Sequence, residues 1–169
     1  MKYNHRLIDF FKRHNMYDKT VFEYLQNNST MIDYNDPDQR KFSGCFYILN
    51  KNDILKDIKL YLPYVNNEQT MLISIHEITH GIENYMKIGK KFIKDITLEA
   101  LPLLYEKLYI MENPSEELIK YGEYLDKIIT EEYAKEYKFA LAIREELINN
   151  YHFDMIEMSK LIKKLSKKY

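Results

Sequence analysis

The amino-acid sequence predicts an α+β protein that is mostly helical, with one small antiparallel β-hairpin ahead of its central helix. Residues 42–64 are rich in β-branched and aromatic side chains on either side of a turn-forming cluster, which is typical of a hairpin. The remaining segments space their apolar residues as helices do and begin with helix-capping residues. No internal repeat or linker divides the 169 residues, so we expect a single domain over residues 1–169.

Composition narrows the class of protein. Hydrophobic residues make up 46% of the chain and charged residues 30%, which predicts a packed core. The formal net charge of -1 argues against a domain built to bind nucleic acid. The single cysteine, Cys45, excludes an intrachain disulfide and any zinc site built from several thiolates. No apolar run approaches the roughly 20 residues of a membrane span, and the N-terminus has no signal-peptide pattern. We therefore expect a cytoplasmic protein without a nucleic-acid or membrane partner.

Two helices and a loop are expected in the first forty or so residues. Apolar residues recur along one stripe of residues 4–14, which predicts the first helix. Asp18 is a suitable N-cap for a second helix over residues 18–26. Residues 28–40 are rich in Asn, Asp, Ser and Pro, so this segment is expected to be a loop.

Residues 42–49 and 56–64 are expected to form the two strands of the hairpin, with the turn at residues 50–53. Pro63, near the end of the second strand, favours an edge position in the sheet. An edge strand directly before the central helix could pair with an extended peptide through main-chain hydrogen bonds. We expect the strand over residues 56–64 to serve substrate pairing in this way rather than merely to cover the core.

Helices are expected over most of the remaining chain. A capping box formed by Asn66 and Gln69 opens the central helix, and an Asn-Pro-Ser-Glu sequence opens a later long one. Pro102 is expected to bend the helix between these two. The four helices are expected at residues 66–88, 96–111 and 113–149 and from Asp154 onward.

The central helix carries the residues most informative about chemistry, His76-Glu77-Ile-Thr-His80. Histidines four residues apart lie one turn above each other on one helix face, where both imidazoles can bind one tetrahedral metal ion. Glu77 is about 100° further round the helix, where it can reach a water molecule rather than the metal. This is the arrangement of the HExxH zinc-peptidase motif. The positions around it are uncharged, as expected for a buried metal-binding helix: Ile73, Ser74, Ile75, Ile78, Thr79, Gly81 and Ile82.

The motif and the residues after it resemble a known family. His76-Glu-x-x-His80 followed by Glu99-Ala, a nearby Pro102 and Glu106 resembles the active site of the thimet-oligopeptidase-like gluzincins. In its small size the chain looks more like a minigluzincin, and the resemblance covers residues 61–111. It departs from the larger family in a shorter interval after His80 and in a leucine before the proline. The resemblance implies a zincin-like fold, a bound zinc ion (Zn²⁺) and the cleavage of peptide bonds in a peptide or protein substrate.

The resemblance also implies that Glu99 is the third zinc ligand, leaving the fourth position for water. Glu83 and Glu106 remain alternatives for that role. Glu83 lies on the same helix face as His80, and Glu106 could instead orient another ligand or be an ordinary surface charge. The metzincin class is excluded, because Glu83 and Met86 stand where it requires Gly and His.

A mechanism follows from this set of residues. Zinc lowers the pKa of its water towards about 7 and polarises the scissile carbonyl. Glu77 is expected to take the proton of the water as general base and to pass it to the leaving amine. Gluzincins commonly stabilise the developing oxyanion with a Tyr or His from a later element. Tyr133 and Tyr137 on the expected long helix are the candidates here.

A function of another class is also compatible with these residues. The chain could be a non-catalytic helical interaction or regulatory protein whose metal is structural or sensed reversibly. A closed site with four protein ligands, completed by Glu83 or Glu106, would favour the structural role.

Overall fold

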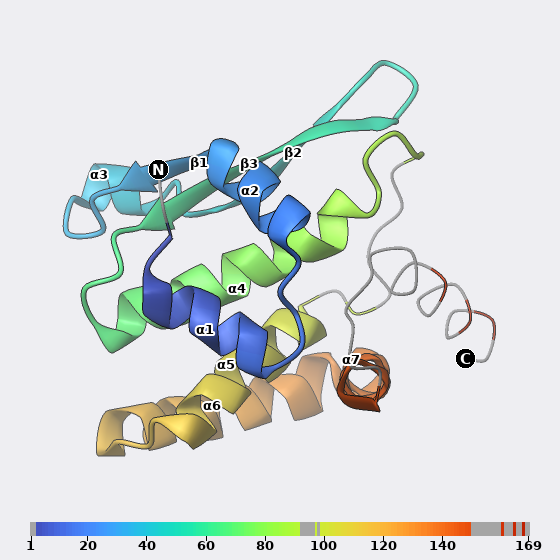
Figure 1. Cartoon of the computed structure of the whole chain (residues 1–169). Helices are drawn as coiled ribbons and strands as arrows, with labels where there is room; N and C mark the ends of the chain where they lie inside the picture. Colours follow the sequence, from blue (N-terminus) through green and yellow to red (C-terminus); the bar gives the residue numbers. More distant parts are fainter. Residues whose placement is uncertain are drawn as a thin grey trace. The chain divides into compact units, whose positions relative to one another are not determined.

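Seven helices and three strands are defined in the described part of the chain, in agreement with the mostly helical α+β class predicted from the sequence. The computed structural model describes residues 3–91, Thr97, residues 99–149 and three single residues near the C-terminus, Lys160, Lys164 and Lys167. The chain divides into two compact units, Met1–Ile93 and Lys94–Tyr169. All three strands belong to the first unit (Figure 1).

The two N-terminal helices lie where the sequence predicts them, and the second begins at the predicted N-cap, Asp18. Helix α1 (His5–Arg13) follows Asn4, whose side chain accepts a hydrogen bond from the Arg6 N–H. Helix α2 (Lys19–Asn27) follows Asp18, whose carboxylate accepts one from the Val21 N–H. Both predicted helices are therefore confirmed. Their inward faces bury a cluster of apolar side chains, Leu7, Phe10, Phe11, Val21, Phe22 and Leu25.

The sheet has three strands in the order β1-β3-β2. Strands β2 (Gly44–Leu49) and β3 (Leu55–Pro63) form the predicted antiparallel hairpin. Strand β1 (Ser29–Ile32) lies in the segment predicted to be a loop, and it pairs in parallel with β3. A short helix, α3 (Pro37–Arg40), occupies another part of that segment.

The prediction that the strand over residues 56–64 lies at the edge of the sheet is wrong. Strand β3 is central, because β1 covers one of its sides and β2 the other. Pro63 is tolerated in this central strand because it is the last residue, opposite Ile32 at the end of the ladder. A substrate peptide therefore cannot add to β3 as expected, and among the described strands β2 and β1 form the edges.

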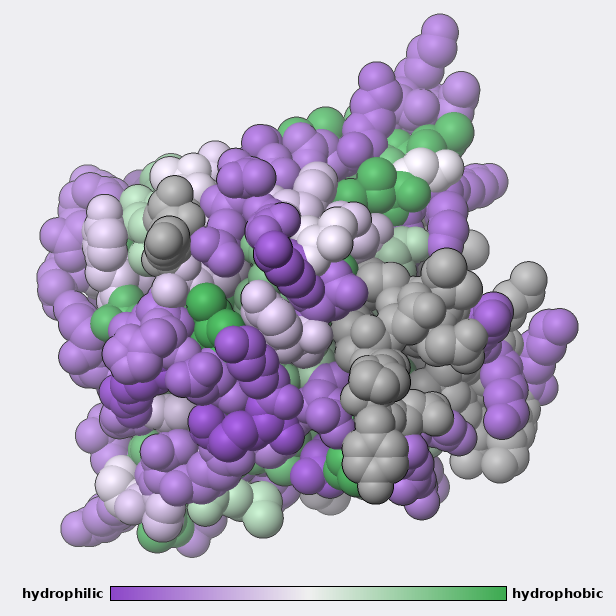
Figure 2. Space-filling view, in the orientation of Figure 1, coloured by the Kyte–Doolittle hydropathy of each residue, from purple (hydrophilic) through white to green (hydrophobic). Residues whose placement is uncertain are grey.

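One face of the sheet is buried by helices. Ile58, Leu60 and Leu62 alternate along β3 and are fully buried, and helix α4 packs on β3 and β2. Figure 1 shows α4 running below the sheet, with α1 and α2 beside it. Strand β2 is less covered. Hydrophobic side chains are visible around the β2–β3 hairpin in Figure 2, and those exposed on β2 are Phe46, Tyr47, Ile48 and Leu49.

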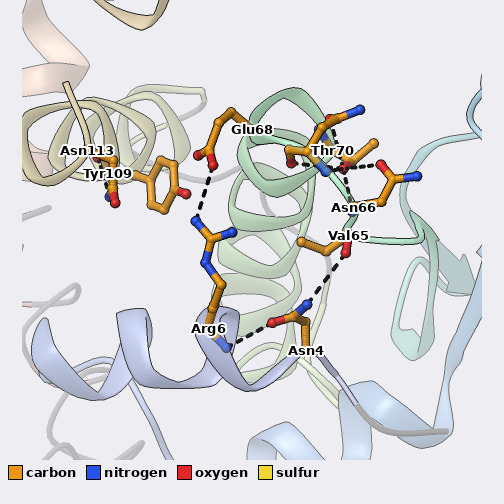
Figure 3. A network of polar contacts seen from close by, with 9 residues as sticks. Asn4, Arg6, Val65, Asn66, Glu68, Thr70, Tyr109 and Asn113 are labelled. Atoms are coloured by element: carbon orange, nitrogen blue, oxygen red, sulfur yellow. Dashed lines mark hydrogen bonds and ion pairs between the residues drawn. The ribbon is translucent and has the colours of Figure 1, made fainter. Parts of the chain in front are cut away.

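Helix α4 (Glu68–Tyr85) is the central helix of the first unit. The predicted capping box is shifted by one residue: Asn67 caps the Thr70 N–H, and the Thr70 hydroxyl oxygen accepts from the Asn67 N–H. The side chain of Asn66 also takes part, because it accepts a hydrogen bond from the Thr70 hydroxyl (Figure 3). Figure 3 also shows Arg6 of α1 bonded to Glu68, at 3.2 Å, which ties the first turn of α4 to α1.

The second unit contains three described helices, α5 (Ala100–Glu112), α6 (Glu116–Glu132) and α7 (Ala134–Asn149), and each packs on the other two. The long helix predicted over residues 113–149 is broken at Tyr133. The apolar stripe of α6, which includes Leu125 and Ile129, is not continued beyond that point, since Glu132 and Glu136 occupy the next positions. It resumes at Phe139, so a break lets both halves turn an apolar face towards α5.

Most of the helix predicted from Asp154 onward lies outside the described residues; the three that are described, Lys160, Lys164 and Lys167, are helical. Within the part of the chain that the structure covers, no helix is both long enough and apolar enough to cross a membrane.

Candidate metal centre

His76 and His80 lie on one face of α4, as the spacing predicts. Their ring centroids are 4.9 Å apart and the ring planes meet at 72°. Both side chains are partly exposed, as is Glu77, which follows the first histidine. The two imidazoles are therefore close enough to share one ion and still accessible to solvent.

The other faces of α4 hold the helix in place. Ile75, Ile78 and Ile82 are fully buried. Two buried hydroxyl groups on this helix are satisfied by its own backbone: the Ser74 hydroxyl donates to the Thr70 carbonyl, and the Thr79 hydroxyl donates to the Ile75 carbonyl. The apolar positions around the motif thus serve packing, whereas His76, Glu77 and His80 are partly exposed.

Glu99 stands at the N-terminus of α5. It occupies the N-cap position, with φ -86 and ψ -12, and its side chain makes no capping hydrogen bond. Its backbone carbonyl accepts a hydrogen bond from the Leu103 N–H at 3.0 Å. The backbone of Glu99 is thus fixed by the first turn of α5.

Among the described residues, His76, His80 and Glu99 form a group of side chains that could hold a metal ion. One ligand atom of each residue lies within 4.8 Å of the other two. Ligand atoms bound at about 2.1 Å to one tetrahedral zinc ion are roughly 3.4 Å apart. Two imidazole nitrogens and one carboxylate oxygen are a donor set that suits zinc.

Neither alternative third ligand belongs to this group. Glu83 is buried, with 1% of its surface exposed, and one of its carboxylate oxygens is 3.7 Å from Nδ1 of His80. Glu106 is also buried and accepts a hydrogen bond of 2.9 Å from the Tyr121 hydroxyl. The interpretation of Glu106 as an ordinary surface charge is therefore wrong.

The two candidate tyrosines differ in their surroundings. Tyr133 lies at the junction of α6 and α7, and its pKa is raised above the ordinary value by partial burial and then by the negative charge of Glu99. The pKa of Tyr137 is also raised, chiefly by burial, but its charged neighbours are Lys107, Asp126 and Arg144. Only Tyr133 shares its environment with Glu99, and its hydroxyl keeps its proton at neutral pH.

Sequence reasoning missed the burial of Glu83 and Glu106. A signal was present, because Glu83 continues the buried positions Thr79 and Ile82 along α4, and Glu106 follows an unbroken apolar run of α5. A carboxylate at a position that helical periodicity assigns to the core is rarely unpaired, and this rule would have singled out both residues.

Comparison with known proteins does not assign the chain to a family. No protein-family model matches the chain, and neither the curated proteins nor the solved structures give a match. What the protein does therefore has to be inferred from its own residues.

Proposed function

We propose that the protein is a zinc-dependent metallopeptidase of the gluzincin type, with a zincin-like fold. His76, His80 and Glu99 bind the zinc ion, and Glu77 is the general base. The observation that carries this proposal is the grouping of three ligand atoms within 4.8 Å of one another around an HExxH helix. The order of the ligands supports it: two come from one helix, and the third lies at the start of the next.

In the proposed cleavage of a peptide bond, the zinc ion and the side chains of the protein have separate roles. A bound zinc ion supplies a water of lowered pKa and a Lewis acid for the scissile carbonyl. The carboxylate of Glu77 removes a proton from the attacking water and delivers it to the nitrogen of the leaving amine. The Tyr133 hydroxyl, which stays protonated at neutral pH, donates a hydrogen bond to the oxyanion that develops on the carbonyl oxygen.

An open site favours catalysis over a structural role. A structural zinc site has four protein ligands, whereas a catalytic one keeps a position for water. Among the described residues, the candidate group contains three ligands and includes neither Glu83 nor Glu106. Within the described ranges, the non-catalytic alternative, a helical interaction or regulatory protein with a structural metal, finds no fourth ligand in this group.

The substrate is a peptide or protein segment in an extended conformation. Extended peptides add to sheet edges through main-chain hydrogen bonds and are selected by alternate side chains. Strand β2, rather than the strand over residues 56–64, is the strand that pairs with the substrate peptide. It is an edge strand, because it pairs with β3 on one side only. Its exposed Phe46 and Ile48 are apolar, so apolar substrate side chains are favoured.

The substitution Glu77→Gln tests the proposal directly. Glutamine has the shape of glutamate but cannot accept the proton, so zinc should remain bound while peptide cleavage falls by about a hundredfold or more. Zinc content is measured by elemental analysis, and kcat/KM is measured on a peptide found by a library screen with mass-spectrometric detection. The variant Glu68→Gln on the same helix is the matched control and should keep its activity. Unchanged cleavage by the Glu77→Gln variant would refute the proposal.

A further inference from the structure

Glu83 is a buried carboxylate beside a proposed metal ligand. It follows His80 by three residues on α4, and only 1% of its surface is exposed. Glutamate is almost never buried to this degree unless it has a partner. Its Oε2 is 3.7 Å from Nδ1 of His80, an ion-pair distance slightly longer than a hydrogen bond. This buried oxygen and the ring nitrogen are therefore within ion-pair range of each other.

The carboxylate meets a particular nitrogen of the ring. A neutral histidine carries its proton on either Nδ1 or Nε2, and the nitrogen that binds a metal is set by the hydrogen bond that the other makes. A carboxylate at Nδ1 favours the proton on Nδ1, which leaves the lone pair on Nε2. Glu83 itself is not in the group of three ligands, so it acts on His80 rather than on the ion.

We infer that Glu83 is a positioning residue: its carboxylate holds His80 in the Nδ1–H form and fixes the direction in which Nε2 presents its lone pair. This inference rests on the proposed function, since it assigns His80 a metal to bind.

The first experiment measures the tautomer of His80 in the metal-free protein by long-range ¹H–¹⁵N NMR. The parent protein should show the Nδ1–H form. Glu83→Leu, which removes the acceptor while keeping an apolar side chain of similar length, should lose that preference, and Glu68→Gln should not. An Nε2–H form in the parent would overturn the inference even if Glu83→Leu fails to fold. The same tautomer in parent and folded variant would overturn it too.

The second experiment measures zinc affinity by competition with a fluorescent chelator. Glu83→Gln should bind zinc about tenfold to a hundredfold more weakly than the parent while still binding one ion per chain. Glu68→Gln should bind as the parent does. Unchanged affinity would overturn the inference, and complete loss of zinc would make Glu83 a ligand instead. A parent that binds no zinc would defeat the proposed function, whereas the tautomer measurement would still decide the role of Glu83.

Discussion

Tyr133 and Tyr137 are identical side chains four residues apart that the fold places in different surroundings. The break between α6 and α7 falls at Tyr133 and leaves it next to the charge of Glu99. Tyr137 lies within α7, and the Lys107 ammonium is 5.8 Å from the centre of its ring. Residue type and spacing made these two tyrosines equal candidates, and their neighbours distinguish them.

We expect Tyr133→Phe to lower kcat by about a hundredfold, because it removes one hydrogen bond to the oxyanion. The zinc content should not change, since the phenol is not a ligand. Tyr137→Phe is the matched control and should keep kcat close to that of the parent. Steady-state kinetics on the same peptide decide the point, and equal losses in the two variants would contradict the assignment of Tyr133.

Tyr3 makes stability depend on alkaline pH. Burial raises its pKa above the ordinary value of 10.0, although the hydrogen bond with Ser29 acts in the opposite direction. Above pH 10 the unfolded chain loses this proton while the folded protein keeps it, so the free energy of unfolding falls as pH rises. The fall from this one group amounts to at most about 1.4 kcal/mol per pH unit.

Urea unfolding between pH 9 and pH 11 tests this effect. Tyr3→Phe should be less stable than the parent at pH 7, by about 1 kcal/mol, because it loses the hydrogen bond to Ser29. Its stability should fall less steeply above pH 10, so the two curves converge. Parallel curves would show that Tyr3 does not retain its proton in the folded state.

At the scale of elements, helices with strong local signals are the part of the fold that the sequence could predict. Asn4, Asp18 and Ser115 act as N-caps in the structure, and the helices they begin were expected. Strand β1 could not be predicted in this way. Its four residues lie in a polar segment, and they form a strand because they pair with Leu60–Pro63, about thirty residues away. The edge prediction for β3 failed for the same reason.

Some features of the candidate site could likewise be predicted from local sequence patterns, and others could not. The positions of His76 and His80 on one face follow from helical spacing alone, so they could be predicted from residue numbers. The proximity of Tyr133 to Glu99 depends on packing between elements and on the break in the predicted long helix. Local patterns carry no direct information about such contacts.

Alanine substitutions at two helical glycines, Gly81 and Gly122, test how closely the helices pack at each position. A Cβ at Gly81 would lie 3.0 Å from a methyl group of the buried Leu25, whereas one at Gly122 would meet nothing closer than Ile110 at 3.6 Å. In a helix interior, alanine raises the free energy of unfolding by up to about 1 kcal/mol relative to glycine. Gly122→Ala should therefore raise the free energy of unfolding by about 0.5–1 kcal/mol. Gly81→Ala should lower it by about 1 kcal/mol, because overpacking outweighs that gain.

Urea denaturation of both variants measures these changes. Equal stabilisation by the two substitutions would show that α2 and α4 do not approach each other closely at Gly81. Because Gly81 directly follows His80, the Gly81→Ala variant should also be assayed for zinc content, to separate loss of stability from loss of the site.

At the scale of the whole molecule, the chain consists of two compact units, Met1–Ile93 and Lys94–Tyr169. Each unit has its own buried core, built around the sheet and α4 in the first and around α5 in the second. Loss of the metal should therefore remove activity without unfolding either core.

The central claim is that His76, His80 and Glu99 bind one zinc ion, and metal content tests it most directly. Protein purified without added zinc is analysed for metal, together with His80→Ala, Glu99→Ala and, as a matched control, Glu106→Gln. We predict about one zinc ion per chain in the parent and the control, and none in the two ligand variants. A parent that holds no zinc even after zinc is added back would contradict the account, as would a Glu99→Ala variant that keeps its zinc.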